Sequence, residues 1–209
     1  MRDINSARRQ FSLALLASPL AGNALAQAPN VEASYIEALR RGNCMVLIRH
    51  AVTVPGIGDP PGMRLGDCST QRDLSEEGRA QSRRFGQWFR NAGLTPARVR
   101  SSQWCRCLNT AKEAFSEKNF GKPLTIEPWI ALNSFFQGHG NRNAQLEEAM
   151  REAQSIAMRR SYGQFEVWVT HQVNISALAN HSPGMGEMIV AAFDAPTKPL
   201  KILASGLTF

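Results

Sequence analysis

Short apolar runs alternate with longer amphipathic stretches along most of this 209-residue chain. The first run, residues 45–48 (Met-Val-Leu-Ile), follows a Gly-Asn pair and is typical of a strand buried on both faces. We predict further strands at 98–102, 124–127, 165–170, 187–193 and 200–204, and helices at 31–41, 75–91, 104–120, 144–162 and 175–179. This alternation predicts an α/β fold, a three-layer αβα sandwich with a mostly parallel central sheet.

Charged and titratable side chains follow the predicted strands at the point where each strand ends. Arg49 and His50 come directly after the first strand, and His171 directly after the strand at 165–170. Arg106 lies at the start of the helix that follows the strand at 98–102. A single histidine in such a place is more often structural, but the carboxyl ends of parallel strands share one edge of a sheet, where ligands bind. Taken together, these residues predict a site.

Two long connections are expected to border that site. Residues 54–73 leave directly from His50 and are too rich in proline and glycine to form a helix or strand. Residues 129–143 form the second loop, which carries His139. Long loops in small domains are usually functional, so we expect the first loop to shape a substrate pocket.

Four segments resemble the signatures of one family. Residues 47–53 (Leu-Ile-Arg-His-Ala-Val-Thr) resemble the Arg-His-Gly-x-Thr signature of the histidine phosphatase, or phosphoglycerate-mutase-like, superfamily. Residues 73–81 resemble its Leu-Ser/Thr-x-x-Gly-x-x-Gln segment, 101–111 its Ser-x-x-x-Arg-x-x-x-Thr-Ala segment, and 169–171 the strand that delivers its second histidine. The four segments occur in the family's order, and the resemblance implies a phosphoglycerate-mutase-like fold.

The resemblance also implies a chemistry. His50 would be the nucleophile that accepts a phosphoryl group, and Arg49 and Arg106 would bind its oxygens with paired donors. His171 would add a hydrogen bond, and Thr53, the threonine of the first signature, is a candidate substrate-binding residue. Such a set requires neither a metal ion nor a cofactor, and we expect neither.

The chain departs from the family at two places. Ala51 replaces the glycine after the histidine, a change of one methyl group that we expect the site to tolerate. One branch of the family carries a glutamate as proton donor after its third strand, where residues 131–134 read Ala-Leu-Asn-Ser. Another branch has an aspartate after the second histidine, where this chain has Gln172.

The proton donor therefore has to be sought elsewhere. Asp59 and Asp67, in the loop beside His50, are the available carboxylates, and turn capping is an equally good account of either. We predict Asp59 as the catalytic acid, because Asp67 precedes a cysteine. His139 is a further candidate, although a surface position is the simpler interpretation.

The N-terminus has the features of an export signal. Arg8 and Arg9 precede an apolar run at 13–20, and Ala24-Leu25-Ala26 fits a cleavage site. Paired arginines resemble the twin-arginine signal. We predict a signal peptide at 1–26, a single domain at 27–209, and a periplasmic or otherwise exported protein. No apolar run reaches the length of a transmembrane segment.

The chain has four cysteines, and an exported protein is expected to form disulfides. Cys44 lies in the first strand and is expected to be a buried free thiol. Cys68 is then expected to pair with Cys105 or Cys107, since a Cys-x-Cys spacing is not that of a zinc site.

Charge and composition narrow the choice of partner. The formal net charge is +7, which suits an anionic substrate. No basic run is interleaved with aromatics and only two tyrosines are present, so we expect no nucleic-acid partner.

The sequence predicts a phosphomonoesterase that acts on a small phosphate ester through a phosphohistidine intermediate. The alternative is a catalytically weak, phosphosugar-binding member of the same fold. A mutase fits export less well, and a metal hydrolase is the weakest interpretation.

The signal, the Cys68 loop and residues 104–107 resemble an exported branch associated with phosphosugars of the lipopolysaccharide core. An envelope phosphosugar is therefore the expected substrate, and the oligomeric state stays open.

Overall fold

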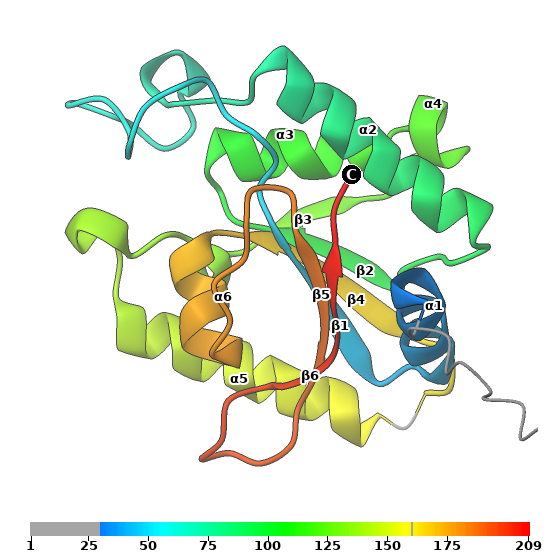
Figure 1. Cartoon of the computed structure of the whole chain (residues 1–209). Coiled ribbons are helices and arrows are strands. Elements are labelled where there is room, and N and C mark those ends of the chain that lie inside the picture. The colour runs from blue at the N-terminus through cyan, green and yellow to red at the C-terminus, as the bar shows by residue number, and fades with distance from the viewer. Residues whose placement is uncertain (1–29, 160) are drawn as a thin grey trace, which may run out of the picture.

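The computed structural model describes residues 30–159 and 161–209, in which helices cover both faces of a six-stranded sheet (Figure 1). The strand order is β3-β2-β4-β1-β5-β6. The strands are β1 (Cys44–Arg49), β2 (Arg98–Ser101), β3 (Ile126–Pro128), β4 (Phe165–Thr170), β5 (Met188–Ala192) and β6 (Lys201–Leu207). β3, β2, β4 and β1 run parallel, and β5 pairs antiparallel with both β1 and β6. The predicted α/β class and mostly parallel sheet are confirmed, whereas the predicted signal at 1–26 lies outside the described residues.

A helix lies in each region where the sequence predicts one. The helices are α1 (Val31–Arg41), α2 (Glu76–Asn91), α3 (Cys105–Ala114), α4 (Glu117–Phe120), α5 (Arg142–Met158) and α6 (Gln172–Ala179). Short 3-10 turns lie at η1 (Cys68–Thr70), η2 (Ile130–Leu132) and η3 (Phe136–Gly138). Within the described ranges, no helix is long and apolar enough to cross a membrane.

Three of the predicted helices differ from the structure. The single helix expected at 104–120 is two helices, because Ser116 is extended and interrupts the hydrogen-bonded turns. The helix expected at 144–162 starts earlier, since Asn141 caps it by accepting from the backbone N–H of Ala144. It also ends earlier, because Tyr162 instead forms a bridge with Gly42. The helix expected at 175–179 begins at Gln172, directly after His171.

Two apolar cores lie on the two faces of the sheet. Val46 and Ile48 of β1 point into the core that α1, α2 and α3 cover, whereas Met45 and Leu47 point into the core that α5 and α6 cover. All four side chains are fully buried. Successive side chains of a strand alternate between faces, so a strand covered on both sides needs a continuous apolar run.

Close backbone packing fixes α2 beside the end of β1. A Cβ atom on Gly78 would lie 1.8 Å from the carbonyl oxygen of Val52, and one on Gly86 would lie 1.7 Å from that of Ala114. Only glycine allows such approaches. The glycine of the 73–81 segment therefore lets α2 lie directly on the chain that leaves β1 and carries His50.

The disulfide joins Cys68 to Cys105, with Cα atoms 5.6 Å apart, and Cys44 and Cys107 are buried free thiols. The expected state of Cys44 is confirmed, and of the two partners considered for Cys68 the structure has Cys105. The bridge connects the 54–73 loop to the start of α3.

Candidate active site

A cavity of about 260 Å³ lies at the carboxyl ends of the central parallel strands. The four residues expected to form the site all line it: Arg49 and His50 after β1, Arg106 in the first turn of α3, and His171 after β4. The other lining residues are Gly56, Ile57, Gly58, Arg72, Ser134, Phe136, Gln172, Val173 and Met185. α3 and α6 both begin beside this cavity, and the N-terminus of a helix favours a bound anion.

His50 is a neutral imidazole with one nitrogen free. Its Nδ1 lies 3.0 Å from the carbonyl oxygen of Ala51, which can only accept, so the ring proton is on Nδ1 and Nε2 keeps its lone pair. Burial, followed by the positive charge of Arg106, lowers the pKa of His50 to about 3. The side chain is 4% exposed. The imidazole is therefore uncharged at neutral pH, as a nucleophile must be.

The backbone after His50 is held by residues of the other family-like segments. The N–H of Ala51 donates to Thr110 Oγ1 (3.0 Å), and the hydroxyl of Thr110 donates to the carbonyl of Arg106 (2.7 Å). The N–H of Val52 donates to Gln81 Oε1 (3.1 Å). The threonine and the glutamine of those segments thus fix the position of His50 relative to Arg106.

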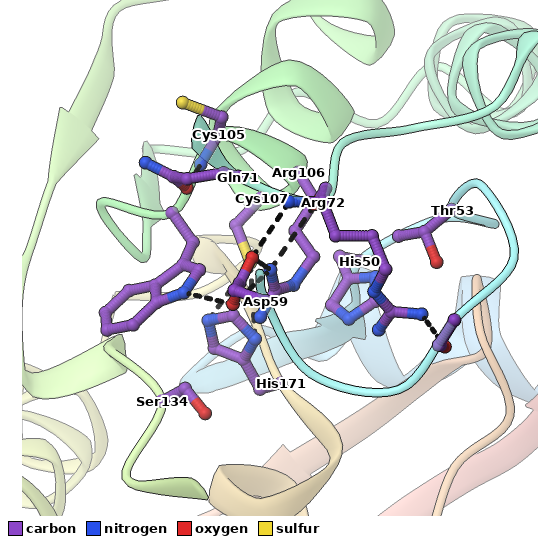
Figure 2. A network of polar contacts seen from close by, with 12 residues as sticks. His50, Thr53, Asp59, Gln71, Arg72, Cys105, Arg106, Cys107, Ser134 and His171 are labelled. Carbon is purple, nitrogen blue, oxygen red and sulfur yellow. Dashed lines mark hydrogen bonds and ion pairs between the residues drawn. The ribbon is translucent and has the colours of Figure 1, made fainter. Parts of the chain in front are cut away.

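His171 faces His50 across the cavity floor, with ring centroids 5.5 Å apart. Its Nε2 lies 2.8 Å from Ser102 Oγ and 3.4 Å from Cys107 Sγ. Cys107 and His171 lie close together in Figure 2. Burial, and then the charge of Arg106, holds the pKa of His171 well below its usual range. Burial also raises the pKa of the Cys107 thiol to about 12, so this cysteine is a buried neighbour of His171 and not a thiolate.

Three guanidinium groups converge on the cavity. Arg49 donates from Nη1 to the carbonyl of Pro183 (2.8 Å), Arg106 donates to Asp59, and Arg72 donates to the carbonyl of Gly56. In each of the three, the Nε–H is buried and has no hydrogen-bond partner among the described residues. Three guanidinium groups that line one cavity are suited to the oxygens of an anion.

Arg72 is a site residue that the sequence analysis missed. It lies at the end of the 54–73 loop, directly before the 73–81 segment, and Figure 2 shows it beside Arg106 and His50. Burial, and then the charge of Arg106, lowers the pKa of Arg72. The sequence could have indicated Arg72 as a site residue, because it lies next to a segment that resembles the family and in a loop expected to border the site.

Asp59 binds Arg106. Its carboxylate accepts from Arg106 Nη1 at 2.8 Å and 3.0 Å, from Trp104 Nε1 at 3.0 Å and from the N–H of Arg72 at 3.0 Å. Burial by itself raises the pKa of Asp59, but the hydrogen bond and charge of Arg106 outweigh it, and the pKa lies below its usual value. An ionised carboxylate that already accepts from several donors carries no proton to give. In this geometry Asp59 is an ionised acceptor, and its role as proton donor stays a prediction.

The remaining candidates do not line the cavity. Thr53 is buried beside it, with its hydroxyl 3.8 Å from the sulfur of Met185. Asp67 caps η1 and pairs with Arg64 at 2.7 Å, away from the histidines. His139 packs edge-on against Trp104 with ring centroids 5.7 Å apart, and lines a neighbouring cavity of about 350 Å³.

The described residues provide neither a metal centre nor a neutral carboxylic acid at the site. No group of three or more His, Cys, Asp or Glu side chains among residues 30–159 and 161–209 could hold a metal ion. The titratable side chains that line the cavity are three arginines and two histidines. The site can thus bind an anion and offer a neutral imidazole to it.

Comparison with known proteins yields one family model and a set of solved structures. Residues 45–133 match the model of the histidine phosphatase superfamily (branch 1). No curated protein matches the chain.

Three solved structures share the fold. The protein histidine phosphatase SixA, complexed with tungstate, is 14% identical (TM-score 0.53) over 76% of this chain and 93% of that chain. The mycobacterial glucosyl-3-phosphoglycerate phosphatase is 16% identical (TM-score 0.54), over 78% and 98%. The protein of open reading frame Rv3214 from Mycobacterium tuberculosis is 17% identical (TM-score 0.52), over 79% and 97%. Identities this low support a shared fold and no more.

Proposed function

We propose that this protein, of which residues 45–133 match the model of the histidine phosphatase superfamily, is a phosphomonoesterase that hydrolyses a small phosphate ester through a phosphohistidine intermediate. The observation that carries this proposal is the state of His50, a buried, neutral imidazole with a free Nε2 beside three guanidinium groups. A neutral imidazole can attack phosphorus, and fixed positive charges stabilise the oxygens of the transition state.

In the first half of the reaction Nε2 of His50 bonds to phosphorus and the bond from phosphorus to the ester oxygen breaks. The electron pair stays on that oxygen, and the alcohol leaves after taking a proton from solvent. Arg49 and Arg106, which line the cavity, bind the equatorial phosphoryl oxygens through their guanidinium groups. Asp59 holds the other side of the Arg106 guanidinium, which keeps Nε oriented. In the second half a water molecule attacks the phosphohistidine, inorganic phosphate leaves, and His50 regains its lone pair.

A binding protein without useful catalysis is the second candidate. It is favoured by the side chains around the cavity, since none of the described ones is a carboxylic acid that could protonate an alkoxide leaving group. An aryl phosphate separates the two functions, because nitrophenolate leaves without a proton.

Turnover of p-nitrophenyl phosphate by the purified protein is therefore the test. We expect hydrolysis that persists in EDTA, since the proposed groups need no metal, and a loss of at least ~10³-fold in kcat for His50→Asn. A wild-type protein that binds phosphate but does not hydrolyse the ester would establish the binding function instead.

We further propose that residues 1–26 are a cleaved export signal and that 27–209 form the mature domain in the periplasm. The Cys68–Cys105 disulfide supports this, because such bonds persist in oxidising compartments. An envelope phosphosugar is the substrate that this location favours. N-terminal sequencing of the protein from a periplasmic fraction tests the proposal: a start at Gln27 is expected, and an intact Met1 would contradict it.

A further inference from the structure

Arg72 is a third arginine at the cavity, in addition to Arg49 and Arg106, which we assign to the phosphoryl group. Among the three guanidinium groups, only Arg106 has a carboxylate within ion-pairing distance in the described part of the chain, namely Asp59 at 2.8 Å. Arg49 and Arg72 each make one hydrogen bond to a backbone carbonyl and keep a buried, unpartnered Nε–H. Arg72 lines the cavity and has no carboxylate partner in the described part of the chain, so its positive charge is available for a further anionic contact.

The position of Arg72 indicates which part of a substrate it contacts. Arg106 is buried with 5% exposure, whereas Arg72 is half-buried and donates to Gly56 of the 54–73 loop. Burial lowers the pKa of His50 most, and the charges of Arg106, Arg49 and Arg72 follow in that order. The Arg72 charge is thus the weakest of the three at the nucleophile. A leaving group lies on the side of phosphorus opposite the attacking nitrogen, so we assign to it the arginine whose charge acts least on that nitrogen.

The described lining residues restrict the leaving group further. None of them is a carboxylic acid, and Asp59 is held ionised by Arg106. An alkoxide leaves poorly without a proton, whereas a phosphate group leaves as a stable anion and needs only compensating positive charge. A third guanidinium without a proton donor is the arrangement that such a leaving group requires.

We propose that Arg72 binds the leaving phosphate of a diphosphate monoester, and that the protein removes the terminal phosphate of such substrates in preference to hydrolysing simple alkyl phosphates. This inference rests on the proposed function of His50. Nε2 of His50 attacks the terminal phosphorus, and the bond from that phosphorus to the bridging oxygen breaks. Its electron pair stays on the oxygen, so the leaving group is a phosphate monoester anion that Arg72 stabilises. Water then cleaves the phosphohistidine, and the released proton goes to solvent.

The test compares n-butyl diphosphate with n-butyl phosphate, which carry the same organic group, by the release of inorganic phosphate. We expect wild-type kcat/KM to be at least ~100-fold higher on the diphosphate, because only there is the leaving group an anion that Arg72 can stabilise. Arg72→Ala is expected to remove ~100-fold of kcat/KM on the diphosphate and less than ~10-fold on p-nitrophenyl phosphate. Arg72→Lys, which restores a positive charge, is expected to recover part of the diphosphate rate.

Arg64→Ala is the matched control, because Arg64 is an exposed arginine of the same loop that pairs with Asp67 outside the cavity. It is expected to leave all rates at the wild-type level. Equal wild-type rates on the two butyl substrates, or an equal loss on all substrates in Arg72→Ala, would overturn the proposal. A wild-type protein that fails to hydrolyse p-nitrophenyl phosphate would instead overturn the proposed function itself.

Discussion

Lowering the pH from 8 to 5 is expected to destabilise the protein through His50, whose pKa is lowered to about 3 in the folded state by burial and by Arg106. The ordinary histidine pKa is 6.5. Between these values the unfolded chain binds a proton that the folded protein does not, so the free energy of unfolding falls as the pH falls. For these two pKa values the loss at pH 5 is about 2 kcal/mol. His171 contributes in the same direction, since its pKa is also held low.

Urea denaturation at pH 8 and pH 5, in buffers without phosphate, measures this effect. His50→Asn removes the titrating group. Between pH 8 and pH 5, the free energy of unfolding of this variant is therefore expected to fall by about 2 kcal/mol less than that of the wild type. Ser134→Ala is the matched control, because it changes a cavity residue that does not titrate, and it should retain the wild-type dependence. An identical pH dependence in wild type and His50→Asn would refute the assignment of a buried, neutral His50.

Three substitutions test other parts of the site. Arg106→Lys is expected to lower kcat/KM on p-nitrophenyl phosphate by at least ~10²-fold, nearly as much as Arg106→Ala. The reason is that the point charge of lysine does not replace the planar guanidinium. Near-wild-type rates for the lysine variant would exclude a contact between the guanidinium and the phosphoryl group. Asp59→Asn is expected to change the rates on aryl and alkyl phosphates by a similar factor, since Asp59 contacts the arginine that binds the phosphoryl group common to both. A selective loss on the alkyl phosphate would restore the proton-donor role. Replacement of Cys68 and Cys105 by serine removes a disulfide between residues 37 positions apart. The free energy of unfolding, measured with urea, is expected to fall by up to about 4 kcal/mol. An unchanged free energy of unfolding would show that the disulfide does not stabilise the protein.

The strands and the paired histidines could be predicted because their signal is local. A continuous apolar run such as that of β1 is required where both faces of a strand are covered. His50 and His171 follow two neighbouring parallel strands, so their proximity follows from the topology alone. The family-like glycine at 78 and glutamine at 81 both contact Val52, which is distant in sequence, and only the resemblance to the family singled them out.

The contacts of the 54–73 loop could not be predicted, because they depend on the path of an irregular segment. Asp59 was expected as an acid from its type and nearness in sequence, but its charge state depends on the contact with Arg106. Arg72 reaches the cavity through the same loop. The partner of Cys68 was also open, since residues two apart on a helix point to nearly opposite sides and the sequence does not show which side faces the loop. Cys105 faces it, whereas Cys107 lies against His171.

The most direct measurement of nucleophilic catalysis by His50 is the detection of phosphate bound to the protein. The wild type is mixed with labelled phosphate ester, quenched within one turnover, and digested for peptide mapping. We predict a label that is lost in acid, survives base, and lies on the peptide that contains His50; Ser134→Ala should retain it and His50→Asn should not. Label that persists in His50→Asn, or turnover by the wild type without any bound phosphate, would contradict the phosphohistidine mechanism.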